Sequence, residues 1–133
     1  MDYKTLKFAM NTYEDNKKRL LKAQAELDLI LYDLANVRGV GYDQQGGSTN
    51  TLQKALNWLK KDEKYNAKER EVIYYRNAIQ IVEDAKKLLP ELLWNMMADK
   101  YINGLTFVEL GAKYGYSRSG CQSMLAREVE KYL

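Results

Sequence analysis

The residues of this chain that could recognise a ligand by their type and spacing lie near its C-terminus. They are an arginine, a glutamine and two serines at helical spacing, namely Arg118, Ser119, Gln122 and Ser123. Arginine donates two hydrogen bonds to guanine, glutamine pairs with adenine, and serine bonds to bases or to phosphates. No acidic residue occurs in residues 117–127. The pattern favours a helix that reads the major groove of DNA over an ordinary solvated helix face.

Contacts with the DNA backbone are expected from residues that flank this helix. Basic side chains and hydroxyl groups commonly bond to phosphate oxygens, and the candidates are Thr106, Lys113, Ser117 and Arg127. Residues 90–133 carry five basic and five acidic side chains, so this region is neutral. Phosphate neutralisation supplies much of a protein's affinity for DNA. A dimer, or a partner already on DNA, would compensate for the missing charge.

The sequence around these candidates predicts two helices joined by a tight turn. Thr106 and Glu109 match a capping box, so a helix should begin there. Gly115 suits the left-handed position just past a helix end, and Ser117 suits the N-cap of the next helix. The inner face of that helix is an apolar stripe of Cys121, Met124 and Leu125. This is a helix-turn-helix, with residues 117–132 as the recognition helix in the major groove.

Three other residues of the motif have expected packing roles. Gly111 should let the backbone of the second helix pass closely, and the ring of Tyr116 should fold back onto the apolar face. Gly120 lies inside the second helix, where glycine costs roughly 1 kcal/mol relative to alanine. It either allows the backbone to approach DNA or is a tolerated weak point.

The elements before the motif are expected to be long helices. Residues 3–37 contain neither glycine nor proline, so they are expected to form one amphipathic helix, along which leucines repeat as in a coiled coil, at Leu20, Leu27, Leu31 and Leu34. Residues 39–50 are predicted to be a loop, after which Asn50 and Gln53 can cap a helix whose Leu52, Leu56 and Leu59 face the first one. Residues 51–89 could form one helix or two. An antiparallel helical hairpin is the expected result.

Pro90 is favoured at the first position of a helix, so a new helix is predicted over residues 90–103, ended by Gly104. Leu93, Met97 and Tyr101 should form its face toward the two helices of the motif. The fold class is therefore predicted to be all-α. A helical scaffold (residues 1–89) precedes a three-helix DNA-binding unit (residues 90–133).

Enzyme and membrane functions find little support in the composition. The chain has no histidine and a single cysteine, so it lacks the residues of a Ser-His-Asp triad, a Cys-His pair or a thiolate zinc site. Neither catalysis nor a cofactor is expected. No apolar run approaches the ~20 residues of a membrane span, and the N-terminus lacks the apolar core of a secretory signal. We therefore expect a cytoplasmic protein with no membrane partner.

Residues 88–133 resemble the C-terminal region of small bacteriophage regulators of the ArpU and RinA type, and more remotely region four of bacterial sigma factors. The shared features are a helix ending in a tyrosine and a glycine, a threonine-capped helix, a Gly-Tyr-Ser turn and a terminal recognition helix. Residues 1–87 resemble these proteins in architecture. The chain departs from the pattern at Cys121, where a branched apolar residue is usual, and at Glu128, where a small residue is usual.

The resemblance implies a regulator of phage or prophage late genes in a bacterial host cell, with double-stranded DNA as its partner. The helical arm would then form a homodimer or contact RNA polymerase. Two alternatives stay open. One is the DNA-recognition subunit of a phage packaging machine, similar to a small terminase. The other is a protein-interaction module that inhibits a host nucleic-acid machine without binding duplex DNA.

Overall fold

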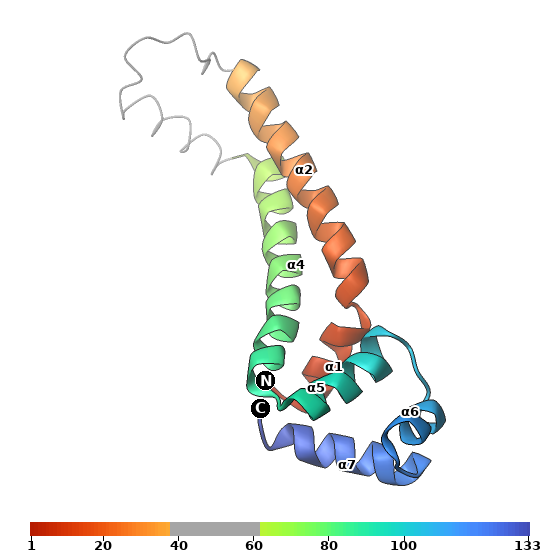
Figure 1. Cartoon of the computed structure of the whole chain (residues 1–133). Coiled ribbons are helices and arrows are strands. Elements are labelled where there is room, and N and C mark those ends of the chain that lie inside the picture. Colours follow the sequence, from red (N-terminus) through yellow and green to blue (C-terminus); the bar gives the residue numbers. More distant parts are fainter. Residues whose placement is uncertain (38–61) are drawn as a thin grey trace. The chain divides into compact units, whose positions relative to one another are not determined.

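The computed structural model describes residues 1–37 and 62–133, and in these residues it consists of helices joined by turns (Figure 1). The prediction of an all-α fold is confirmed. The predicted loop 39–50, the cap at Asn50 and Gln53, and the leucines at 52, 56 and 59 lie outside the described residues. The helices are α1 (Tyr3–Asn11), α2 (Tyr13–Val37), α4 (Glu63–Leu88), α5 (Glu91–Met97), the π-helical turn η1 (Ala98–Ile102), α6 (Phe107–Tyr114) and α7 (Arg118–Glu130).

The chain divides into two compact units. One comprises residues 1–17 and 77–133, and the other comprises residues 18–76. This division differs from the sequence-based one at residue 90, because the N-terminal helix and the second half of α4 belong to the unit that contains α5, α6 and α7. We call residues 1–17 and 77–133 the terminal unit and residues 18–76 the arm unit.

Within the arm unit, α2 and α4 lie side by side as the predicted antiparallel pair (Figure 1). The amide of Gln24 accepts a hydrogen bond from Arg76 at 3.3 Å, and Glu26 forms an ion pair with Lys68 at 2.5 Å, so residue numbers rise along one helix as they fall along the other. The buried residues of this pair are Ala23, Leu27 and Val72, against which Leu20, Tyr65 and Tyr75 pack. Leu20 and Leu27 of the predicted leucine stripe therefore contribute to the core between α2 and α4.

One long helix over residues 3–37 was predicted, and this is wrong at Thr12. The residue has φ −101° and ψ 4° and separates α1 from α2. Its hydroxyl donates to the carbonyl oxygens of Phe8 at 3.0 Å and Ala9 at 3.4 Å, and the amide of Asn16 donates to the same hydroxyl at 3.0 Å. Threonine hydroxyls that bond back to the preceding turn bend helices. The break lets α1 pack separately from α2.

The core of the terminal unit brings both ends of the chain together. α1 packs against α7 and η1, although more than 85 residues separate them in sequence. Full burial of a large apolar side chain stabilises the folded state by roughly 1.5–3 kcal/mol. The buried residues are Leu6, Ala9, Met10, Val82, Ala85, Leu89, Leu93, Met96, Met97, Leu110, Cys121, Leu125 and Val129. The inner faces predicted for residues 90–103 and for the second helix of the motif are thus confirmed, and α1 completes the core that they share.

Candidate nucleic-acid interface

The helix predicted over residues 90–103 is present, and its last turn is π-helical. Pro90 caps α5, and η1 continues the helix until Asn103, whose N–H donates to the carbonyl of Ala98 at 2.9 Å. Gly104 then adopts φ 80°, which glycine reaches without a Cβ clash. The face predicted for this helix is directed inward, with Leu93 and Met97 buried and Tyr101 half-buried.

The helix-turn-helix has the local geometry that its sequence predicts. The Thr106 hydroxyl accepts from the Glu109 N–H at 3.1 Å, and the Glu109 carboxylate accepts from the Thr106 N–H at 3.5 Å, so the capping box is complete. Gly115 is left-handed, with φ 82°. The Ser117 hydroxyl accepts from the Gly120 N–H at 3.1 Å and caps α7. The capping box fixes where α6 begins, Gly115 where it ends, and the Ser117 bond where α7 begins.

Two glycines are explained by what a Cβ would meet. At Gly111 it would collide with the backbone carbonyl of Tyr116, so the close approach is real but involves the turn and not the second helix. At Gly120 it would lie 2.7 Å from the Ser117 hydroxyl oxygen and would disturb the cap of α7.

Tyr116 is 41% exposed, so the prediction that its ring folds onto the apolar face is wrong.

The four predicted base-reading residues all lie exposed on α7. Arg118 occupies the first turn of the helix, where no acidic residue occurs. Ser119 and Ser123 are four residues apart, about one helical turn, and Ser123 lines a pocket together with Tyr3 of α1. Gln122 lies toward α1, because it lines a cavity together with Lys7 of that helix. The four residues are therefore accessible to solvent, with α1 along one flank of α7.

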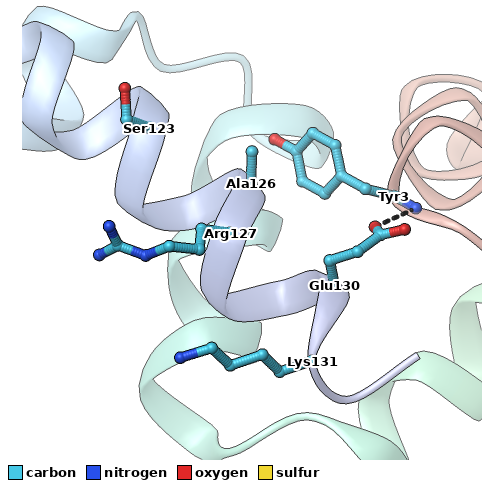
Figure 2. A pocket seen from close by; sticks show the side chains of 6 residues that line it. All are labelled: Tyr3, Ser123, Ala126, Arg127, Glu130 and Lys131. Carbon is cyan, nitrogen blue, oxygen red and sulfur yellow. Dashed lines mark hydrogen bonds between the residues drawn. The ribbon is translucent and has the colours of Figure 1, made fainter.

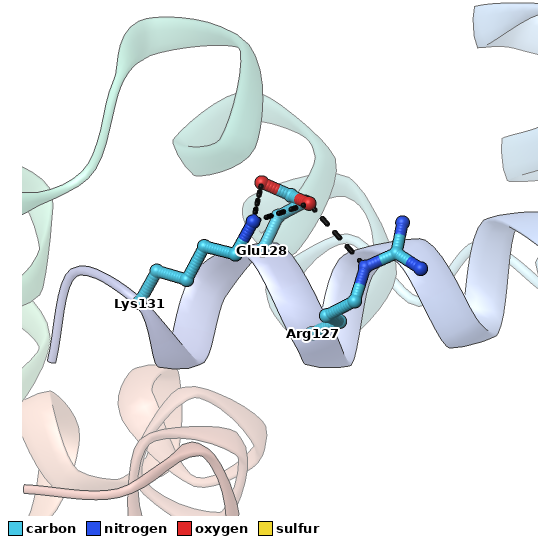
Figure 3. A network of polar contacts seen from close by, with 3 residues as sticks. All are labelled: Arg127, Glu128 and Lys131. Atoms are coloured by element: carbon cyan, nitrogen blue, oxygen red, sulfur yellow. Dashed lines mark hydrogen bonds and ion pairs between the residues drawn. The ribbon is translucent and has the colours of Figure 1, made fainter.

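The predicted phosphate-binding residues have partners within the protein. Thr106 and Ser117 serve as N-caps, as described above. Lys113 forms an ion pair with Asp99 at 2.7 Å. Arg127 contacts Glu128 through Nε at 3.3 Å, and the same carboxylate binds Lys131 (Figure 3). The side chains of Lys113 and Arg127 remain 55% and 68% exposed, so both ion pairs are open to solvent and to a phosphate group.

Asp99 connects η1 to the end of α6. Its carboxylate accepts from Lys113 Nζ at 2.7 Å, from the Tyr114 hydroxyl at 2.6 Å and from the Asn103 amide at 3.1 Å. Burial acts to raise the pKa of Asp99, but the hydrogen bonds from Lys113, Tyr114 and Asn103 outweigh burial, and the pKa lies below its ordinary value. This carboxylate helps to hold the first helix of the motif against the helix before it.

Replacing Asp99 with asparagine should lower the free energy of unfolding by about 1 kcal/mol, since the hydrogen bonds lose their charged acceptor and the partly exposed ion pair is lost. A lowered pKa stabilises the fold above the ordinary value of 3.8 and ceases to do so as the pH falls through the pKa of the folded state. The difference between wild type and Asp99→Asn should therefore shrink below about pH 4. Chemical denaturation at several pH values measures this difference. Glu83→Gln, which removes an exposed acid of the same unit, is the control; an equal effect of both variants would contradict the role of Asp99.

The packing of α1 beside α7 was not predicted from the sequence. The backbone N–H of Tyr3 donates to the Glu130 carboxylate at 2.8 Å, and the Tyr3 side chain lies next to Ala126 (Figure 2). The Tyr3 hydroxyl also shares a hydrogen bond of 2.6 Å with the hydroxyl of Tyr101. Burial is the main cause that raises the pKa of both phenols. The N-terminal helix α1 is therefore fixed along the flank of α7.

Comparisons of the chain with protein-family models, curated proteins and solved structures found no match. No helix in residues 1–37 or 62–133 is both long and apolar enough to cross a membrane. In the same residues, no three cysteine, aspartate or glutamate side chains are grouped so that they could hold a metal ion.

Proposed function

We propose that this protein binds double-stranded DNA sequence-specifically and places α7 in the major groove. The observation that carries the proposal is the pairing of a helix-turn-helix with an exposed, acid-free face. α6 and α7 are joined by a three-residue turn, and α7 presents Arg118, Ser119, Gln122 and Ser123 to solvent. A helix whose first turns carry arginine, glutamine and serine suits direct readout of base edges.

The acids of the terminal unit support this proposal by their positions. Residues 1–17 and 77–133 carry ten basic and ten acidic side chains, so net charge alone gives no attraction to DNA. Several of these acidic side chains form ion pairs or hydrogen bonds within the protein. Asp99 binds Lys113, Glu128 binds Lys131, Glu109 belongs to a capping box and Glu130 accepts from the Tyr3 N–H. The first ten residues of α7 add no acid to the surface.

The biological role follows from the resemblance to ArpU- and RinA-type regulators. We infer that the target is a promoter of phage or prophage genes in the cytoplasm of a bacterial host, where the protein acts as a dimer or together with RNA polymerase. A packaging-recognition subunit would instead assemble into a ring, so the mass in solution separates these two roles. The neutral charge of the terminal unit favours the third role, a protein-interaction module without affinity for duplex DNA.

Selection of bound sequences from random duplex DNA tests the proposal directly, because it requires both binding and specificity. We expect the full-length protein to enrich one short motif. Enrichment of unrelated sequences would mean that the protein binds DNA without reading it. If no duplex is retained at low salt, where electrostatic attraction is strongest, the interaction-module role replaces DNA binding.

A further inference from the structure

A cavity of about 370 Å³ lies between α1, η1, α6 and α7, beside the recognition helix. Its lining includes Lys7 and Asn11 from α1, which are one helical turn apart, Lys100 from η1, and Gln122 from α7. All four side chains can donate hydrogen bonds. None of the residues that line the cavity is acidic. Residues from both ends of the sequence thus form one concave surface that carries two positive charges.

The two ammonium groups lie over aromatic rings. Lys100 Nζ is 4.9 Å from the ring centroid of Phe107, and Lys7 Nζ is 6.0 Å from that of Tyr3. Neither lysine forms an ion pair with any residue in the part of the chain that the structure describes. A ring face attracts a cation but does not neutralise its charge. The rings therefore hold both ammonium groups in place, and both remain available to bind an anion.

The acid nearest to Lys100 in sequence does not compete for it. Asp99 is bound by Lys113 and the Tyr114 hydroxyl, at the end of α6. Asp99 and Lys100 both belong to η1, and single π-helical turns within helices are frequently found at functional sites. Within η1, Asp99 is therefore paired with Lys113, whereas its neighbour Lys100 has no acidic partner among the described residues.

We propose that this cavity binds a backbone phosphate of the duplex that α7 reads. The proposal rests on the proposed function, since Gln122 belongs both to the predicted reading surface and to the lining of the cavity. A recognition helix in the major groove is flanked by the phosphates of the two strands. Lys7 and Lys100 would neutralise one of them, and Asn11 would donate a hydrogen bond to one of its oxygens, while Gln122 stays available to the base edges. α1 thereby sets the position of α7 along the groove and supplies affinity that the neutral motif lacks.

Lys7→Gln and Lys100→Gln test the proposal, because glutamine keeps a polar side chain and removes the charge. Binding of the full chain to its selected duplex and to a scrambled duplex is measured by fluorescence anisotropy at several salt concentrations. Each variant should weaken binding to both duplexes by the same factor, about eightfold at 0.1 M salt. The slope of log K against log salt concentration should fall by about one unit, which is the contribution of one released counterion. The ratio between the two duplexes should stay unchanged.

Lys4→Gln is the matched control, since it removes the same charge from an exposed position of the same helix outside the cavity. It should keep the wild-type salt slope. If Lys4→Gln lowers the slope as much as the cavity variants do, general charge explains the effect and the cavity proposal is wrong. If wild type binds and the cavity variants keep its affinity and slope, the cavity proposal fails while DNA reading by α7 stands. If wild type binds neither duplex, both proposals fail.

Discussion

Leu6→Asp in α1 should destabilise the helix-turn-helix at the other end of the chain by about 3 kcal/mol or more. Leu6 is completely buried in the core that also contains Cys121 and Leu125 of α7. Burying a carboxylate without a partner costs several kcal/mol unless it becomes protonated. The chain has one cysteine, and its side chain is fully buried. The rate at which a thiol reagent labels Cys121 therefore reports opening of this core, alongside thermal melting by circular dichroism.

Phe8→Asp is the matched control, because Phe8 lies in the same helix and is 62% exposed. It should leave both the melting temperature and the labelling rate near their wild-type values. Leu6→Ala provides a milder variant if Leu6→Asp does not fold, and it should cost about 2–5 kcal/mol. Unchanged protection of Cys121 in both Leu6 variants would mean that α1 is not part of the core around α7.

Features that depend on neighbours three or four residues apart could be predicted from the sequence. The capping box at Thr106, the left-handed Gly115 and the Ser117 cap each involve one or two local hydrogen bonds or one backbone conformation. The apolar faces of α6 and α7 follow from helical periodicity in the same way. These local preferences agree with one another, and for that reason the ends and caps of both helices were predicted correctly, whereas the packing of Tyr116 was not.

Features that depend on which surfaces meet could not be predicted in this way. The apolar stripe of α1, with Leu6, Ala9 and Met10, shows that the helix buries one face but does not name its partner. The break at Thr12 depends on its hydroxyl bonding to the previous turn, which helical threonines do only in some contexts. As a result, the sequence alone places α1 in the scaffold and does not reveal the flank that it forms beside Gln122.

The same limitation applies to charged residues of the candidate site. Lys113 was predicted as a free contact to phosphate, but it lies 2.7 Å from Asp99, which is fourteen residues earlier in the chain. Lys7 and Lys100 were not singled out, because each is an ordinary lysine in sequence. They become candidates only when α1 and η1 bring them to one cavity. Ion pairs with acidic residues decide which lysines remain available to a phosphate, and these pairs depend on the fold.

Arg118→Ala should weaken binding to the selected duplex by about 1–3 kcal/mol, roughly fivefold to 150-fold, if α7 reads the major groove. Arg118 is exposed at the start of α7, so its removal should leave the fold intact. Specificity should relax at one base pair, because the partner base loses its two hydrogen bonds. Gln122→Ala should act similarly at a second position. Anisotropy on selected and scrambled duplexes measures both effects, with circular dichroism as the check on folding.

Arg70→Ala is the control for the lost charge, since Arg70 is exposed on α4 in the arm unit. It should leave the preference for the selected duplex unchanged. If Lys113 touches only phosphate, Lys113→Ala should instead weaken binding to all DNA sequences alike and lower the salt slope by about one unit. It also releases Asp99, so its stability must be measured before its affinity is interpreted. Wild-type binding by both Arg118→Ala and Gln122→Ala would exclude α7 as the reading helix. Any DNA binding would then have to come from another surface of the chain.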